Sequence, residues 1–406
     1  MLVYAYACEP DRGSEPGAGW GIVQTLARFA ECTVLVGPEH SAGLLRRAQG
    51  NPEPRVTVVE VPEPHWGGSA KWHRVTWFLL YLEWLRRAAR VARDLHLAAP
   101  FDLAYHATYS AYWLPSPVTR LGIPSVWGPV GGAVVTPLRL WAGLGVFGLA
   151  DELLDLISVR LWETLPPTRR TWRDATVRIV QNETTLGRLP SPLRATTVVL
   201  NHAGLVEVHP RRRQAVGRDV LFLGRLERRK GVALAIRALP YARDVRLIVV
   251  GEGPARRSLQ RLTRRLGVTD RVEFRGRILH AQVAQLLAAA SAVVFPGLRE
   301  EGGVALAEAM YAGVPVIVLA HGGARTIASD ALDVSRVALI PASSTEEVAR
   351  AIGEAMLRFC DSPPADNSPN LDPTYYRQAL EAACRRALAT RVAPHNAAAR
   401  NDPVSQ

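Results

Sequence analysis

Short apolar runs alternate with longer helix-like stretches through most of the chain, and this alternation restricts its fold more than any other feature. In the first half, strand-like runs occupy residues 2–7, 33–36, 56–61, 103–106 and 125–127, and helix-like stretches occupy 19–29, 71–97 and 138–161. Such alternation is typical of βαβ units, in which the strands of one sheet run parallel. The pattern therefore predicts an α/β protein.

The same pattern restarts near residue 200. Two more strand-like runs, at 176–180 and 196–200, are followed by an Asn-His-Ala-Gly turn and an Arg-rich polar stretch, where we place the domain change. Further strands are predicted at 220–223, 245–250, 272–275, 292–295 and 314–318, with helices at 231–239, 255–266, 280–289 and 303–312. A chain of 406 residues is long enough for two cores.

We therefore expect two doubly wound, Rossmann-like domains facing a cleft. Their predicted boundaries are 1–200 and 201–370, followed by a helix at 371–390, for which packing back on the first domain is one arrangement, and a disordered tail at 391–406.

Charge and cysteine content narrow the class of protein. The 49 Lys and Arg residues exceed the 37 Asp and Glu residues, giving a net charge of +12, which attracts phosphate-bearing partners. No recognised nucleic-acid motif supports a nucleic-acid partner. The four cysteines are far apart, with no zinc-like spacing. We expect a cytoplasmic protein, because no leader and no apolar stretch of about 20 residues is present.

The strongest chemical signal joins two acidic residues to a glycine pair. A strand ends at Phe295, Glu300 follows in a loop, Gly302-Gly303 leads into a helix, and Glu308 lies within that helix. Free amides and the positive end of a helix dipole favour an anion there. The two glutamates could line one ligand at different depths, although an amphipathic helix with surface glutamates would also carry them.

A second loop carries two cations. Arg225 and Lys230 flank the start of a helix after the strand that ends at Leu223. This spacing could aim both cations at one diphosphate. Taken alone, a basic surface helix explains the loop equally well.

The segment from Glu300 to Glu308 is similar to the Glu-x7-Glu motif of the family 4 retaining glycosyltransferases (glycosyltransferase group 1), which have the two-domain GT-B fold. The resemblance implies that Glu308 holds the ribose of a nucleotide and Glu300 contacts the transferred sugar. It also implies donor contacts from the backbone of Gly302, Gly303, Val304 and Ala305. The family usually has Phe where Gly302 stands, which bears on the loop shape and the choice of sugar.

The resemblance extends to other loops. It implies that Arg225 and Lys230 neutralise the leaving nucleotide, and that main-chain groups near Arg277 and Ile278 meet the nucleobase. In the first half, it implies donor contacts at Gly17 and Gly19, a catalytic or acceptor contact at His106, and an acceptor-side loop at Gly131 and Gly132. A ligand-free turn and a packed histidine are the alternatives for Gly17–Gly19 and for His106.

The predicted function is transfer of a hexosyl-type sugar from a nucleoside diphosphate sugar to a hydroxyl of a glycan, a lipid-linked glycan or a small molecule. No cofactor and no metal site are expected. A catalytically silent protein of the same fold, binding a nucleotide sugar or a nucleic acid, is the alternative. Peripheral contact with the inner face of a membrane is a further prediction, based on segments 71–81 and 138–149, although core packing explains both segments nearly as well.

Overall fold

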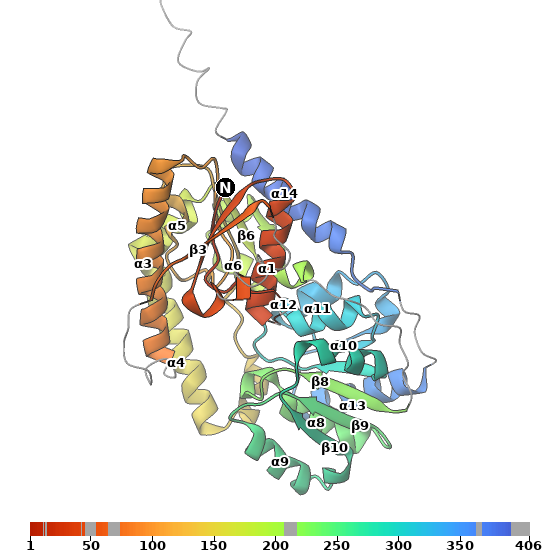
Figure 1. The fold of residues 1–406 in the computed structure, drawn as a ribbon. Coiled ribbons are helices and arrows are strands. Elements are labelled where there is room, and N and C mark those ends of the chain that lie inside the picture. Colours follow the sequence, from red (N-terminus) through yellow and green to blue (C-terminus); the bar gives the residue numbers. More distant parts are fainter. Residues whose placement is uncertain are drawn as a thin grey trace, which may run out of the picture.

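Two separate parallel β-sheets form the framework of the chain, as the computed structural model shows (Figure 1). The structure describes residues 1–10, 12, 14–41, 43–44, 54–63, 74–206, 217–362 and 368–390. The predicted tail, residues 391–406, and most of the Arg-rich stretch after residue 206 lie outside the described residues.

The first sheet has seven strands in the order β3-β2-β1-β4-β5-β6-β7, all parallel. Its strands are β1 (Leu2–Tyr4), β2 (Cys32–Val36), β3 (Val56–Glu60), β4 (Ala104–His106), β5 (Ser125–Val130), β6 (Val177–Val180) and β7 (Thr197–Val199). Its helices are α1 (Ser14–Ala27), α3 (Arg74–Ala98), α4 (Gly145–Thr164), α5 (Pro166–Asp174), α6 (Glu183–Arg188) and α7 (Ser191–Arg194).

The second sheet has six parallel strands in the order β10-β9-β8-β11-β12-β13. They are β8 (Asp219–Leu223), β9 (Arg246–Val250), β10 (Val272–Gly276), β11 (Ala292–Phe295), β12 (Val316–Leu319) and β13 (Val337–Ile340). The helices are α8 (Val232–Ala238), α9 (Arg256–Arg265), α10 (His280–Ala289), α11 (Val304–Tyr311), α12 (Gly322–Ser329), α13 (Thr345–Asp361) and α14 (Pro373–Ala389).

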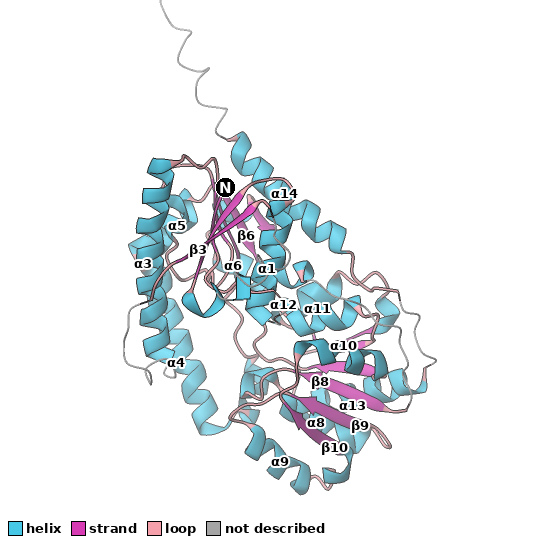
Figure 2. Ribbon diagram, in the orientation of Figure 1, coloured by secondary structure: helices cyan, strands magenta, loops and turns pink. Residues whose placement is uncertain are grey.

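Helices flank both sheets (Figure 2), and the central strands are buried along their whole length. Parallel strands need this cover on both faces, which is why they are continuous apolar runs in the sequence. The predicted fold class, two doubly wound α/β domains, is confirmed.

Two elements pass between the domains. The 3-10 helix η3 (Leu138–Gly143) packs Leu140 into the core of the second domain, whereas Trp162 at the end of α4 packs on Phe78 of the first. Helix α14 packs back against α1, β5 and β6 of the first domain. None of the helices in the described part of the chain is long and apolar enough to cross a membrane.

Helix α1 begins at Ser14, about five residues before the predicted start. Pro16 lies in its first turn, where a missing N–H costs no hydrogen bond. The negative charge of Glu15 is stabilised by the positive end of the helix dipole. The glycines at 17 and 19 are thus part of the helix and not of a loop before it.

Candidate functional site

The turn after β8 is fixed to the loop after β11. Gly231 adopts a left-handed φ of 70°, and a Cβ added there would lie 1.9 Å from the carbonyl oxygen of Pro296. The amide of Leu298 donates to the carbonyl oxygen of Arg229 at 2.8 Å. This close backbone contact brings the two predicted loops together, because both follow neighbouring parallel strands.

Lys230 and Glu300 form an ion pair as a result. Lys230 Nζ lies 2.6 Å from Glu300 Oε2, and the amide of Gly303 donates to Glu300 Oε1 at 3.1 Å. Only 8% of Glu300 is exposed. Both oxygens of the carboxylate are therefore held at the start of a helix, close to a cation.

Helix α11 starts directly behind this pair. Gly303 provides its N-terminal cap with a φ of 80°, a conformation that favours glycine. The amides of Val304 and Ala305 lie in the first turn, where amides have no acceptor within the helix. Glu308 is buried farther along the same helix. The predicted anion site and both glutamates thus share one short segment.

Arg225 lies in the same loop as Lys230 but has a different partner. Its Nε contacts Glu227 Oε1 at 2.9 Å, and Arg229 Nε contacts Glu227 Oε2 at 2.6 Å. Burial would raise the pKa of Glu227, but the charges of Arg229, Arg225 and Lys230 outweigh it and lower the pKa. Arg225 remains largely exposed on the loop.

Gly302 leaves room for a histidine of the turn that follows β7. A Cβ at residue 302 would come within 2.9 Å of His202 Nε2, so a Phe side chain would displace His202. His202 in turn lies 3.6 Å from Glu15 Oε2 in the first turn of α1. The starts of α1 and α11 therefore face each other across His202.

Gly17 and Gly19 lie in that first part of α1. A Cβ at Gly17 would lie 1.9 Å from the carbonyl oxygen of Arg12, and a Cβ at Gly19 would lie 2.3 Å from that of Ala7. Close backbone packing requires both glycines whether or not a ligand binds. Their predicted donor contacts stay a prediction.

Glu301 joins the two domains. Its Oε1 accepts from the amide of Val134 at 2.7 Å, and its Oε2 accepts from Asn182 Nδ2 at 2.9 Å. Asn201 donates to its backbone carbonyl at 3.2 Å. Burial raises the pKa of the Glu301 carboxyl, against the opposing effect of the hydrogen bonds from Asn182, Val134 and Gly132.

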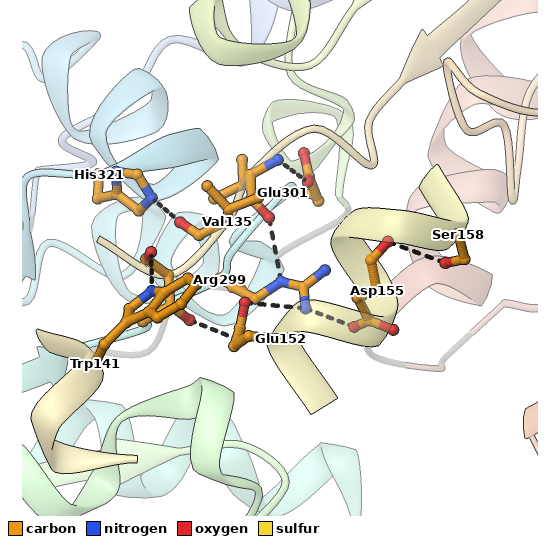
Figure 3. A network of polar contacts seen from close by, with 10 residues as sticks. Val135, Trp141, Glu152, Asp155, Ser158, Arg299, Glu301 and His321 are labelled. Carbon is orange, nitrogen blue, oxygen red and sulfur yellow. Dashed lines mark hydrogen bonds and ion pairs between the residues drawn. The ribbon is translucent and has the colours of Figure 1, made fainter. Parts of the chain in front are cut away.

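Arg299, which precedes Glu300 in the sequence, also contacts Val134, and Figure 3 shows its side chain beside Asp155 and Glu152. Its Nε donates to the carbonyl oxygen of Val134 at 3.2 Å, and its Nη1 contacts Asp155 Oδ2 at 2.6 Å and Glu152 Oε2 at 3.5 Å. The residues on both sides of Glu300 thus hold one residue of the first domain. We call Arg299, Glu301 and Val134 the interdomain clamp.

The loop after β5 forms the first-domain side of this contact. A Cβ at Gly131 would lie 3.0 Å from Glu301 Oε2, and Gly132 has a φ of 95°. His321 Nε2 contacts the carbonyl oxygen of Val135 at 2.7 Å (Figure 3). The predicted acceptor-side glycines therefore lie against the clamp.

The structure does not place the His106 side chain next to Lys230 and Glu300. It is 2% exposed, its Nδ1 contacts Ser116 Oγ at 2.7 Å, and its Nε2 contacts the Tyr81 hydroxyl at 3.3 Å. Burial lowers the pKa of His106 to about 3, with a hydrogen bond to the Thr108 backbone opposing the shift. These contacts favour the alternative interpretation of its motif, a packed histidine, and the predicted catalytic or acceptor contact of His106 stays a prediction.

Arg277 and Ile278 follow β10, at the edge of the second sheet. Arg277 is exposed, and Ile278 is partly buried against the core. They lie at the same carboxyl edge as the loops of Lys230 and Glu300, because all these strands are parallel. Among the described residues, no three His, Cys, Asp or Glu side chains come together as a metal site.

Three residues near the site were not predicted from the sequence: His202, Arg299 and Glu301. The only local signal was a run of charged residues around Glu300, and a polar turn after β7 that contains His202. Neither signal indicates that these side chains contact the other domain.

The second domain is similar in sequence to known glycosyltransferases. Residues 212–358 match the family model of glycosyl transferases group 1. The chain is 35% identical over 146 residues to a D-inositol 3-phosphate glycosyltransferase of Mycobacteroides abscessus, which covers 34% of this chain and 32% of the relative. It is 34% identical over 148 residues to a 2-deoxystreptamine N-acetyl-D-glucosaminyltransferase of Streptomyces fradiae, covering 34% of each chain. The matched segment thus spans about a third of these relatives.

Solved structures resemble the chain over nearly its full length. WaaG, a glycosyltransferase involved in lipopolysaccharide biosynthesis, has a TM-score of 0.54 at 17% identity, covering 94% of this chain and 99% of that one. Anabaena HepE in complex with UDP and glucose has a TM-score of 0.54 at 15% identity, covering 94% and 98%. At this identity the likeness shows the fold, which is the GT-B arrangement.

Proposed function

We propose that the whole chain is a nucleotide-sugar-dependent glycosyltransferase, because residues 212–358 match the family model of glycosyl transferases group 1. It transfers a hexosyl-type sugar to a hydroxyl acceptor with retention of the anomeric configuration. The acceptor is a glycan, a lipid-linked glycan or a small molecule.

One observation carries the proposal. The Lys230–Glu300 pair lies at the start of α11, with Glu308 buried farther along the same helix. A cation, first-turn amides and two carboxylates suit a ligand with a diphosphate in the middle and a hydroxyl-bearing sugar on each side of it. A nucleoside diphosphate sugar has these groups in this order.

In the proposed reaction, the acceptor oxygen bonds to the anomeric carbon while the bond from that carbon to the diphosphate oxygen breaks. The acceptor proton passes to the departing diphosphate on the same face of the sugar. Lys230, Arg225 and the first-turn amides of α11 stabilise the negative charge that develops on the leaving group. Glu300 orients the transferred sugar, and Glu308 binds the ribose.

The proposal is tested first by donor binding. A panel of nucleotide sugars is titrated calorimetrically into the wild-type protein, and the donor that binds is repeated with Glu308→Gln. We expect the variant to bind about 10- to 100-fold more weakly, because it loses hydrogen bonds to a charged acceptor. Glu354→Gln, an exposed change on α13, is the matched control.

Unchanged affinity in Glu308→Gln, with an unchanged melting temperature, would contradict the assigned role. An assay of turnover then distinguishes an active glycosyltransferase from a protein that only binds the donor. Slow hydrolysis of the bound donor, or transfer to an added acceptor, is expected for the wild type and should fall by about 100-fold in Lys230→Ala. Donor binding without either reaction would favour the silent protein.

A further inference from the structure

Helix α4 exposes its apolar side. Five large residues of this helix are 49–80% exposed, and we call them the α4 face: Val146, Leu153, Leu154, Ile157 and Leu161. At about 100° per residue these positions fall within an arc of about 100° on one side of the helix. The α4 face is therefore one continuous stripe and not a set of scattered residues.

Three acidic residues of α4 face the protein instead, whereas Asp151 and Arg160 are exposed. Glu152 and Asp155 contact Arg299 of the interdomain clamp, and Glu163 accepts a hydrogen bond from Tyr112 at 2.7 Å. A helix at a water-exposed surface normally has the opposite polarity, with its charges outward and its apolar side in the core. Packing among the residues that the structure describes does not account for the outward apolar stripe.

The helix is nevertheless anchored at both ends. Leu144, just before α4, is buried in the core of the second domain, and Trp162 near its end packs edge-on against Phe78 at 5.1 Å. Figure 1 shows α4 at the margin of the molecule, running from the first domain towards the second. The α4 face is thus a fixed surface on the outside of the fold.

Exposed arginines follow this stripe in the sequence, on the end of α4 and on α5. Between residues 160 and 174 the exposed charged residues are four arginines and one aspartate, namely Arg160, Arg169, Arg170, Arg173 and Asp174. Arg160 pairs with Glu163, and Arg173 pairs with Asp174, which leaves an excess of positive charge on α5. An apolar stripe on one helix and surplus arginines on the next helix match the chemistry of an anionic lipid surface, with acyl chains beneath phosphate groups.

The other segment predicted to touch a membrane, residues 71–81, packs its described aromatic side chains within the first domain. Residues 71–73 lie outside the described residues, and Trp77 stacks on Tyr81 while Phe78 packs on Trp113 and Trp162. The described aromatic side chains of this segment therefore contact other aromatic side chains of the first domain.

We propose that the α4 face docks the protein on a bilayer that contains anionic phospholipid. The apolar residues enter the boundary between headgroups and acyl chains, and the arginines of α5 contact the phosphates. Docking and the candidate site then use opposite sides of one helix, because the inner side of α4 holds Arg299 next to Glu300.

The test is vesicle flotation of the full chain at low salt, with phosphatidylcholine vesicles alone or mixed with phosphatidylglycerol. We expect binding to the mixed vesicles, weak binding to phosphatidylcholine alone, and loss of binding as salt rises. The triple variant Leu154→Gln/Ile157→Gln/Leu161→Gln should bind at least about tenfold more weakly, because it removes apolar contact area.

The matched control is Leu97→Gln/Leu332→Gln/Val334→Gln, which changes three residues of similar exposure elsewhere. It should float like the wild type, and all proteins should have similar melting temperatures. Wild-type protein that stays unbound, or an α4 variant that floats as well as the control, would overturn the proposal. So would a wild-type dimer that the α4 variant converts to a monomer without any lipid binding, because a second copy would then cover the face.

Discussion

Two histidines, one within a strand of the first sheet and one just after its last strand β7, differ in what surrounds them. His106 lies within β4, and both of its ring nitrogens contact side chains of the same domain. His202 lies after β7, in the 3-10 helix η4 (His202–Leu205), where its ring fills the space left by Gly302. The sequence motif favoured the first histidine, but a residue beyond the end of a strand is the one that reaches the other domain.

His106 should make the protein less stable in acid. Between pH 6.5 and about 3 the unfolded chain binds a proton at this side chain and the folded chain does not. The contribution of His106 to the unfolding free energy should therefore be fully present above pH 6.5. Below that pH, the unfolding free energy should fall by up to about 1.4 kcal/mol per pH unit. His106→Gln, which keeps hydrogen-bonding groups but does not titrate, should show a shallower fall in urea unfolding between pH 7.5 and 5. Parallel pH profiles for the two proteins would contradict this account.

At the scale of elements, the site depends on two turns that touch. Each turn follows a strand of the second sheet, and the contact of Gly231 with Pro296 sets the distance between Lys230 and Glu300. The sequence predicted both turns, since each has a strand, a glycine and a helix start. It did not predict that they touch, because strand order is not encoded within either segment.

Gly231→Ala should therefore strongly destabilise the folded protein. It combines a left-handed φ of 70° with a Cβ only 1.9 Å from a backbone oxygen, and we expect a loss of roughly 3 kcal/mol in unfolding free energy. Gly267→Ala is the control, because its φ of 65° is similar but no atom lies within 4 Å of the added Cβ. Its loss should be about 1 kcal/mol, from backbone conformation alone. Equal losses in urea denaturation would show that the contact with Pro296 is not tight.

At the scale of the whole molecule, the interdomain clamp links the position of Glu300 to the position of the first domain. Arg299 and Glu301 hold the carbonyl and the amide of Val134, so Glu300 cannot shift without moving residues of both domains. Removing one partner of a partly buried, charged hydrogen bond is destabilising, because the other partner is left without a hydrogen bond.

Glu301→Ala should loosen this contact. The amide of Val134 loses its acceptor, so hydrogen exchange in the loop after β5 should accelerate by about tenfold or more. Hydrogen exchange with mass spectrometry on peptides covering residues 131–136 measures the change. Glu273→Ala, which removes an exposed ion pair with Arg275, should leave that loop unchanged. Unaltered exchange in Glu301→Ala would mean that other contacts hold the domains together.

The sequence by itself determined the two parallel sheets and the chemistry of the loop from Glu300 to Glu308. Both are local properties, because strand and helix periods, glycine turns and helix starts are encoded in residues close along the chain. Tertiary structure alone decided the clamp, whose partners Val134 and Glu301 are 167 positions apart. It also decided the outward polarity of α4, because a helical period shows that a stripe exists but not which side meets the core.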